Sequence, residues 1–238
     1  MKFDSQRAIV LGGSSGIGLA TAQALIDQGA SVVIGGRDTG RLAAAAEQLG
    51  SRCTTEAIDV LDREALGALF EKHSGTNLLV NAATGGERAV GPFRDMALDG
   101  FQGSFRKLWG YTNSVHAALP YLAEDAAIVL IGGAPARKCP PGYSAISTVG
   151  NAVEGFCRAV AVEIAPRRIN VVAPGVIDTP MFPVQGADRD KFLSGATADY
   201  LIKRPGRAEE VADAILFTLG NGFVTGTTID VEGGSLLP

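Results

Sequence analysis

The sequence predicts a doubly wound α/β fold, in which a mostly parallel sheet of about seven strands carries helices on both faces. Short β-branched segments alternate with longer, alanine-rich helical segments along the chain, and this alternation is typical of such sheets. The chain has 238 residues, of which 46% are hydrophobic and 19% charged, so it can bury a large core. No internal repeat or low-complexity linker divides it, and residues 1–238 are expected to form one domain.

The predicted strands are short runs that end in turn residues. In chain order they are 8–13, 31–36, 54–60, 77–83, 126–133, 168–175 and 226–234. The predicted helices between them are 17–29, 39–50, 62–73, 101–122, 143–165 and 208–219. Gly29 and Gly50 end the first two helices, as glycine commonly does.

Residues 178–206 do not fit this alternation. The stretch is rich in glycine, proline and charge, and it is expected to be irregular. Because long loops in compact domains are uncommon and often functional, it is interpreted as a lid over a substrate.

Composition argues against several classes of protein. The net charge of −4 and the pI near 5.3 do not suit a general nucleic-acid binder. The three cysteines, Cys53, Cys139 and Cys157, lack the close spacing of a disulfide framework or a zinc site. We find no signal peptide, no apolar run long enough to span a membrane and no cluster of metal ligands. The expected setting is the cytoplasm, without a membrane or nucleic-acid partner.

The first predicted strand runs into a glycine-rich turn, "LGGSSGIG" (11–18), with glycines at 12, 16 and 18. The spacing is looser than G-x-G-x-x-G, but the physics is shared: glycine lets the backbone approach a pyrophosphate, whose charge meets a helix N-terminus. It is not a P-loop, because no Lys-Ser/Thr pair follows. The alternative is an ordinary glycine-rich turn. The position after the first strand favours nucleotide binding.

The end of the second strand indicates which dinucleotide binds. It reads "GGRD" (35–38), with Gly36 where a binder of NAD usually has an acid, followed by Arg37. The planar guanidinium suits a phosphate, which favours NADP(H). The alternative is a solvated Arg37 in front of a helix that Asp38 caps.

With these motifs in view, the chain resembles the short-chain dehydrogenase/reductases in their shorter, single-domain form, over nearly its whole length. "LGGSSGIG" is similar to their T-G-x-x-x-G-I-G loop, and "IDVLD" (58–62) to D-V-x-D. "LVNAAT" (79–84) resembles L-V-N-N-A-G, with Ala82 and Thr84 as departures. "INVVAPGVIDTPM" (169–181) matches N-x-V-x-P-G-x-x-x-T, and the chain's "VEGG" stands where V-D-G-G is common.

The resemblance implies a bound nicotinamide dinucleotide. In the family, the position of Asp59 meets the adenine amino group, and the positions of Ile177 and Thr179 hold the nicotinamide carboxamide. With Arg37 added from the argument above, the expected cofactor-binding residues are Gly12, Ser14, Ser15, Gly16, Ile17, Gly18, Arg37, Asp59, Val60, Asn81, Ala82, Ala83, Pro174, Gly175, Ile177 and Thr179.

The catalytic positions depart from the family. Its chemistry uses a tyrosine that passes a proton, a lysine four residues on, a serine and often an asparagine. Here the Y-x-x-x-K motif reads "YSAIS", so Tyr143 is present and Ser147 replaces the lysine. The serine position falls on Gly133. The asparagine position falls on Lys107, in "KLWG" (107–110), where N-x-x-G is normal.

Two readings of this altered site stay open. Losing a cation about 4 Å from a phenolate removes roughly 4 kcal/mol at an effective dielectric near 20, which would leave a phenol of ordinary pKa, about 10, a poor catalyst. Alternatively the cation has moved: Lys107 reaches the space vacated at 147 and pairs with Tyr143, while Ser147 or water holds the ribose. Lys107 could equally be a solvated surface residue.

The expected function is therefore an NADP(H)-dependent oxidoreductase acting on a carbonyl or alcohol, with an altered proton relay through the catalytic residues Tyr143, Lys107 and Ser147. The alternatives are an enzyme of the same fold with non-redox chemistry, and a non-catalytic NADP(H)-binding protein. The partner is a small molecule, and relatives suggest a homodimer or homotetramer. The aromatic residues that could face a substrate are Phe182, Phe192 and Tyr200. The lid cations that could face a carboxylate are Arg189, Lys191, Lys203 and Arg204, although a solvated lid surface explains them equally well. Arg137 and Lys138 lie near the expected mouth of the pocket.

Overall fold

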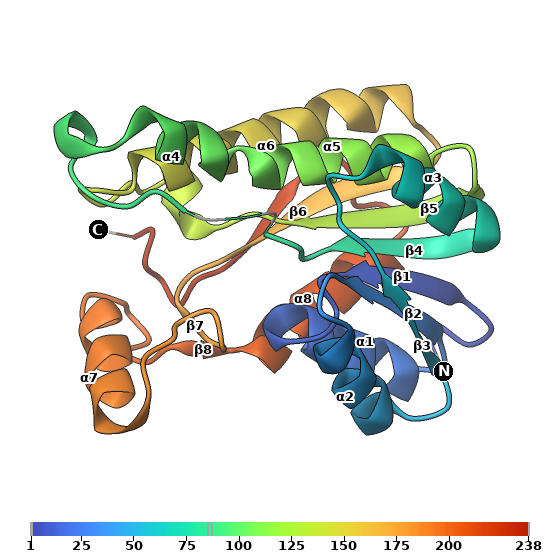
Figure 1. Ribbon diagram of the computed structural model, residues 1–238, viewed down its shortest axis with the longest axis horizontal. Helices are drawn as coiled ribbons and strands as arrows, with labels where there is room; N and C mark the ends of the chain where they lie inside the picture. Colours follow the sequence, from blue (N-terminus) through green and yellow to red (C-terminus); the bar gives the residue numbers. More distant parts are fainter. Residues whose placement is uncertain (1, 85, 87, 238) are drawn as a thin grey trace.

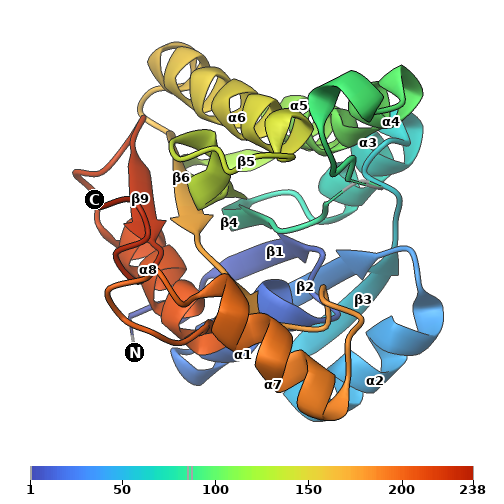
Figure 2. The same cartoon turned by 90° about the vertical axis from the view of Figure 1, so that its left-hand side faces the viewer.

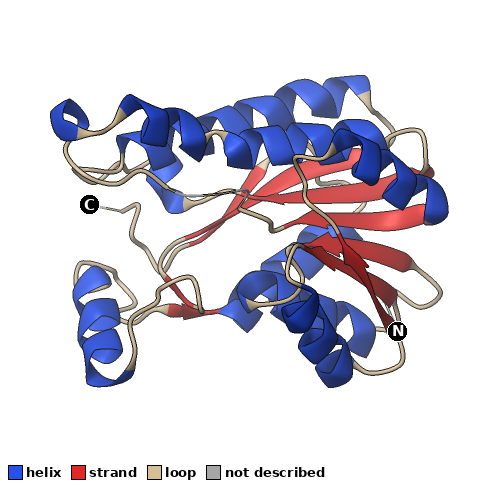
Figure 3. Cartoon of the chain, in the orientation of Figure 1, coloured by secondary structure: helices blue, strands red, loops and turns tan. Residues whose placement is uncertain are grey.

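The computed structural model describes residues 2–84, 86 and 88–237 and has a parallel sheet at its centre (Figures 1 and 3). The strand order is β3-β2-β1-β4-β5-β6-β9, and every neighbouring pair is parallel. The strands are β1 (Arg7–Leu11), β2 (Ser31–Gly36), β3 (Cys53–Ala57), β4 (Thr76–Asn81), β5 (Leu122–Ile131), β6 (Arg168–Pro174) and β9 (Thr228–Val231). The predicted doubly wound α/β fold is confirmed.

Helices cover both faces of this sheet (Figure 1). One face carries α1 (Gly16–Asp27), α2 (Thr39–Leu49) and α8 (Ala208–Gly220). The other carries α3 (Arg63–Lys72), α5 (Arg106–Ala118) and α6 (Ser144–Glu163), with α4 (Leu98–Ser104) beside them. Each face has its own apolar core, because the central strands are buried on both sides and read as continuous β-branched runs. Within the described residues, no helix is both long and apolar enough to cross a membrane.

The chain reverses direction across the sheet between β1 and β4. From β1 it moves outward to β2 and β3, then returns to the other side of β1 to form β4 (Figure 2). Such a switch point opens a crevice at the carboxyl ends of the two strands, where ligands of open α/β sheets bind. The glycine loop after β1 and Asn81 at the end of β4 both lie at this edge.

Two predicted boundaries are corrected. The helix expected over 101–122 is interrupted at Phe105 and ends at Ala118, because Pro120 has no N–H with which to continue the ladder. The lid region is not wholly irregular: it contains α7 (Gly186–Ala196) and the strand pair β7 (Ile177–Asp178) and β8 (Gly206–Arg207). Helix α7 buries Leu193 alone among its residues, so the sequence carries no apolar stripe that would reveal it.

Candidate active site

The glycine loop packs directly against the end of β4. Gly12 has φ +84°, and a Cβ there would lie 2.6 Å from the Ala83 amide nitrogen and 2.7 Å from the Ala82 carbonyl carbon. A Cβ on Gly18 would collide with the Gly12 carbonyl oxygen. Only glycine therefore allows this approach of backbone to backbone. The loop predicted from the glycine spacing forms, and it meets Ala82 and Ala83 at the switch point.

The N-terminus of α1 is open to an anion. Ser15 occupies the N-cap in an extended conformation and makes no side-chain capping hydrogen bond. The first amides of a helix have no partners within it, and the helix dipole makes this end positive. The uncapped amides after Ser15 thus fit the pyrophosphate of a dinucleotide. Gly16 and Ile17 stand in this first turn, as the sequence predicted.

Arg37, after β2, is exposed and makes no hydrogen bond or ion pair with the described residues. Asp38 serves instead as the N-cap of α2 and accepts from the Arg41 amide at 3.0 Å. A Cβ on Gly36 would lie 3.6 Å from the Ser14 hydroxyl oxygen. Gly36 thus presents no side chain to this space, which has the Ser14 hydroxyl beside it and the exposed Arg37 next in the chain.

The ends of β3 and β4 supply two further polar groups. The Asp59 carboxylate accepts from the Leu61 amide at 3.0 Å, and Val60 is buried against Gly110 of α5. Asn81 is fully buried: its Oδ1 accepts from the Ser114 hydroxyl at 2.9 Å, whereas its Nδ2 has no partner among the described residues. A buried unpaired donor is costly, so this amide suits a ligand or water in the crevice.

Residues far apart in the chain meet at the other end of the crevice. Gly175, after β6, donates its amide to the Val231 carbonyl at 3.0 Å, next to Pro174 at the end of β6. Ile177 and Thr179 are buried, and a Cβ on Gly16 would lie 3.3 Å from the Thr179 side chain. The residues expected to hold the nicotinamide therefore lie beside those expected to hold the pyrophosphate.

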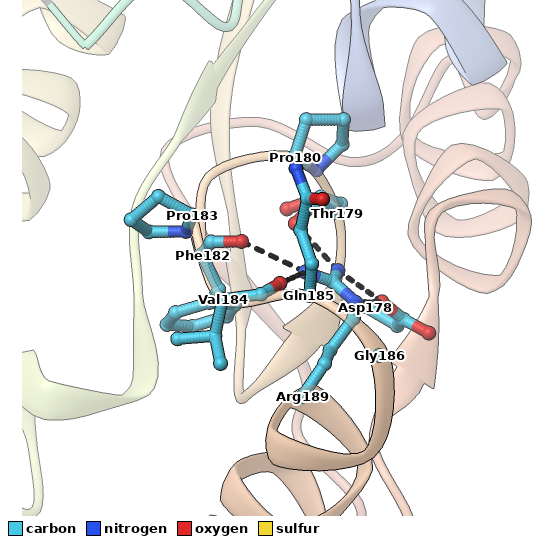
Figure 4. Close-up of a pocket in the computed structure, with 9 residues that line it drawn as sticks. All are labelled: Asp178, Thr179, Pro180, Phe182, Pro183, Val184, Gln185, Gly186 and Arg189. Atoms are coloured by element: carbon cyan, nitrogen blue, oxygen red, sulfur yellow. Dashed lines mark hydrogen bonds and ion pairs between the residues drawn. The ribbon is translucent and has the colours of Figure 1, made fainter.

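Arg189 of α7 organises the start of the lid (Figure 4). Its guanidinium pairs with Asp178 and donates to three carbonyl oxygens, those of Thr179 (2.9 Å), Phe182 (2.7 Å) and Val184 (3.2 Å). The same segment lines a cavity of about 500 Å³. Arg189 is thus used within the protein, which leaves it poorly placed to face a substrate carboxylate.

Several other lid residues also make contacts within the protein. The rings of Phe182 and Phe192 pack against each other, with centroids 5.2 Å apart. The Tyr200 hydroxyl accepts from the Val176 amide at 3.1 Å. Arg204 pairs with Glu210. These contacts hold the lid together. Of the lid cations offered for substrate contact, Lys191 and Lys203 are exposed and make no ion pair with the described residues.

Tyr143 stands at the N-cap of α6, immediately after Gly142, whose φ is +85°. Ser147 follows one turn along and is buried, and its amide donates to the Tyr143 carbonyl at 2.8 Å. Asn151 donates to the carbonyls of Ser147 and Ala136 and so joins α6 to the turn before it. The first turns of α6 are thus fixed to the preceding turn, and Tyr143 stands at the start of this helix.

Lys107 points inward from α5. Its ammonium donates to the Gly132 carbonyl at 3.0 Å and lies 5.7 Å from the centre of the Tyr111 ring. Desolvation, reinforced by the charge of Arg88, lowers the pKa of Lys107 to about 7. Lys107 is therefore not a solvated surface lysine. Its side chain reaches the end of β5, although no hydrogen bond joins it to Tyr143 in the described part of the chain.

Known proteins are similar to this chain over nearly its whole length. Residues 12–235 match the family described as "Enoyl-(Acyl carrier protein) reductase". The carbonyl reductase family member 4 of Danio rerio is 34% identical over 97% of this chain and 98% of its own length. This chain belongs to the short-chain dehydrogenase/reductase family.

Two solved short-chain dehydrogenase/reductase structures add detail. A small-chain dehydrogenase in complex with NADPH has a TM-score of 0.84 and 27% identity, covering 99% of this chain and all of its own. The MalC reductase/Diels-Alderase of Malbranchea aurantiaca has a TM-score of 0.91 and 25% identity, covering 100% and 98%. The first binds NADPH in its crystal, and the name of the second includes a non-redox reaction.

Gly133, at the position where the sequence predicts the family's serine, has no side chain, but the space around it could hold one. Gly133 is in an extended conformation, and a Cβ there would meet the Pro135 ring at 3.5 Å and the Pro174 carbonyl at 4.0 Å. Gly132 is different, because a Cβ there would lie 2.6 Å from the Val171 side chain. Gly132 is therefore required by packing, whereas Gly133 is not.

Arg88 is a member of this site that sequence reasoning missed. Its loop is joined to the start of α6 by a 2.9 Å hydrogen bond from the Gly91 amide to the Gly142 carbonyl. Desolvation lowers the pKa of Arg88, and the nearby phenols of Tyr111 and Tyr143 oppose this change. Position 88 lies in a loop between motifs and carries no family signature, so the sequence offered no signal.

Proposed function

We propose that the protein is an NADP(H)-dependent oxidoreductase that interconverts a carbonyl and an alcohol. The observation that carries the proposal is the inward-pointing Lys107, whose ammonium donates to the Gly132 carbonyl at the end of β5. The family of the chain is one of oxidoreductases, and a relative of known structure is bound to NADPH. The exposed Arg37 beside Ser14 favours the 2′-phosphate of NADP(H).

The cofactor would be held by the chain's own groups along the crevice. The amides after Ser15 take the pyrophosphate, Asp59 the adenine, and Ile177 and Thr179 the carboxamide. When bound, the nicotinamide supplies the hydride that reduces the carbonyl carbon, and it accepts that hydride in the reverse direction.

Tyr143 then donates its phenolic proton to the carbonyl oxygen, and Lys107 restores that proton from solvent. A group whose pKa lies near the working pH exchanges protons most effectively, and the pKa of Lys107 is lowered to about 7. Ser147, which is buried one turn from Tyr143, is assigned to the ribose. In this arrangement Lys107 replaces the lysine that the family has four residues after its tyrosine.

One single and one double substitution test the proposed proton relay. Lys107→Ala is expected to lower kcat/KM for NADPH-dependent carbonyl reduction by roughly a hundredfold or more, the usual weight of an acid–base group, and to remove the limb of the pH–rate profile near pH 7. The variant Lys107→Asn/Ser147→Lys restores the family arrangement and is expected to recover activity. Unchanged turnover in Lys107→Ala would show that the relay is not as proposed.

A second candidate function is non-redox chemistry with the cofactor as a fixed part of the site. It is favoured by the replaced serine and lysine positions, Gly133 and Ser147, and by the likeness to MalC, which is named a Diels-Alderase as well as a reductase. A third, a non-catalytic NADP(H)-binding protein, would bind NADPH and convert nothing. Tight NADPH binding without oxidation by any carbonyl in a broad panel would favour these alternatives.

We also propose a homodimer or homotetramer. Trp109 on α5 is 53% exposed and Val162 on α6 is 82% exposed, and large apolar side chains on helix surfaces are typical of subunit contacts. A cytoplasmic location stays a prediction from the sequence. Sedimentation of the wild type against Trp109→Glu would test the assembly, and a monomeric wild type would contradict it.

A further inference from the structure

Most cations around the pocket mouth are already paired within the protein. Arg137 pairs with Glu154 and Asp230, and Lys138 donates to carbonyls of the C-terminal tail. In the lid, Arg189 pairs with Asp178 and Arg204 with Glu210. These side chains hold segments of the chain together, so they are poorly placed to hold a substrate.

Arg88 and Lys107 differ from that group. In the described part of the chain, no carboxylate forms an ion pair with either side chain, and the charge of Arg88 itself lowers the pKa of Lys107. Two like charges in a desolvated region repel each other and destabilise the empty site. An anion between them would relieve both the repulsion and the lost solvation.

The backbone places the Arg88 loop between the end of α4 and the start of α6. The Gly91 amide donates to the Gly142 carbonyl, and a Cβ on Gly142 would touch the Gly91 backbone at 3.4 Å. The Ala89 amide donates to the Ser104 hydroxyl at 3.0 Å. The loop is thus held at two points just after Arg88, one on Ser104 and one on Gly142, the residue that precedes Tyr143. The Arg88 residue is exposed and so can be reached by a ligand, while partial desolvation of its guanidinium lowers its pKa.

We propose that Arg88, with Lys107 behind it, forms an anion subsite and that the preferred substrates carry a carboxylate near the reacting carbonyl. The inference rests on the proposed carbonyl–alcohol function and adds the substrate class. Arg88 offers a planar fork that takes a carboxylate through two hydrogen bonds. Because its loop is held against Gly142, the bound carboxylate lies on the Tyr143 side of the pocket.

The test uses oxo acids that differ in the spacing between ketone and carboxylate, each paired with its methyl ester. Wild-type protein with saturating NADPH is expected to reduce at least one acid with a kcat/KM tenfold or more above that of its ester. Arg88→Gln is expected to lower kcat/KM for that acid by roughly ten- to hundredfold, the weight of a charge-assisted hydrogen bond, mainly through KM. The ester should change less than about threefold, and Arg88→Lys should recover part of the loss.

Arg94→Gln is the matched control, because Arg94 lies on the neighbouring segment with its side chain 89% exposed, and neither substrate should respond. Preference for the esters in the wild type would overturn the inference. Equal losses for acid and ester in Arg88→Gln would also overturn it, because Arg88 would then act on Tyr143 or on the fold. A matching loss of NADPH affinity would assign Arg88 to the cofactor instead.

Failure of the proposed function would look different. If NADPH binds but neither acid nor ester is reduced, the proposed carbonyl chemistry is wrong. The anion subsite is then tested by the binding of the oxo acid and its ester. Under the inference, the oxo acid, and not its ester, changes the fluorescence of bound NADPH in the wild type but not in Arg88→Gln. The absence of that difference would overturn the anion subsite by itself.

Discussion

The Lys107 ammonium lies 3.0 Å from the carbonyl oxygen of Gly132, so a lysine of α5 reaches the end of strand β5. Gly132 precedes the position at which the family has its catalytic serine. The side chain missing at Gly133 and the long one gained at Lys107 therefore lie at neighbouring points of the backbone, Gly133 and Gly132. This relationship links two sequence departures that lie 26 positions apart in the chain.

The desolvated ammonium of Lys107 makes stability depend on pH. Its pKa is about 7 in the folded protein against 10.5 for an ordinary lysine, so the unfolded chain binds more protons between these values and stability rises with pH there. At about 1.4 kcal/mol per pH unit, Lys107→Met is expected to raise the free energy of unfolding by a few kcal/mol at pH 6, measured with urea on protein free of cofactor.

This advantage of Lys107→Met is full below pH 7 and fades as the pH approaches 10.5. The exposed Lys191 of α7 provides the control, since Lys191→Met should show no such trend. A difference between Lys107→Met and wild type that stays constant from pH 6 to pH 10 would contradict a desolvated ammonium.

The two neighbouring glycines after β5 should respond differently to serine. Gly133→Ser places a hydroxyl at the family position with contacts of 3.5 Å or more, so its unfolding free energy should stay within about 0.5 kcal/mol of wild type. A donor at this point should raise kcat/KM for carbonyl reduction by about tenfold or more, as oxyanion donors do.

Gly132→Ser instead brings Cβ to 2.6 Å from the Val171 side chain and should cost about 1–3 kcal/mol of stability. Urea unfolding of both variants, with steady-state rates for each, checks the pair. Equal destabilisation of the two variants would mean that the spaces around them are not as described.

The lid depends on Arg189, which has an ion pair and three carbonyl contacts. Arg189→Gln is expected to speed amide hydrogen exchange over 178–184 and to raise KM about tenfold with a smaller change in kcat, because substrate binding must then order the loop. Lys191→Gln, on the same helix, is the control. Unchanged exchange in Arg189→Gln would show that the lid is ordered by other contacts.

Arg37 should determine the choice of dinucleotide. Arg37→Gln is expected to weaken NADPH binding by roughly ten- to hundredfold through the loss of charge-assisted hydrogen bonds and to leave NADH binding unchanged, as measured by fluorescence titration. Arg41→Gln removes an exposed arginine on the same side that pairs with Asp38 and should affect neither. Equal loss for both dinucleotides would remove Arg37 from the 2′-phosphate.

The sequence by itself was enough for the fold, because its signals are local. Buried parallel strands need continuous apolar runs, and the approach of Gly12 to Ala82 requires glycine. Where local signals are weak, the sequence was not enough. Helix α7 buries a single side chain, so no apolar periodicity marks it in the sequence. The structural role of Arg189 became visible only in the fold, where Asp178 and three carbonyl oxygens surround its guanidinium.

Some residues of the candidate site could be predicted from the sequence, and others could not. Tyr143, Ser147 and the glycine loop could be located from motifs, since each sits at a fixed offset from a strand or helix end. The inward direction of Lys107 was decided by the packing of α5 against the sheet. The place of Arg88 was decided by the hydrogen bond between Gly91 and Gly142, residues 51 positions apart. No local pattern encodes such a contact, because it forms only when the strands have set the two loops side by side.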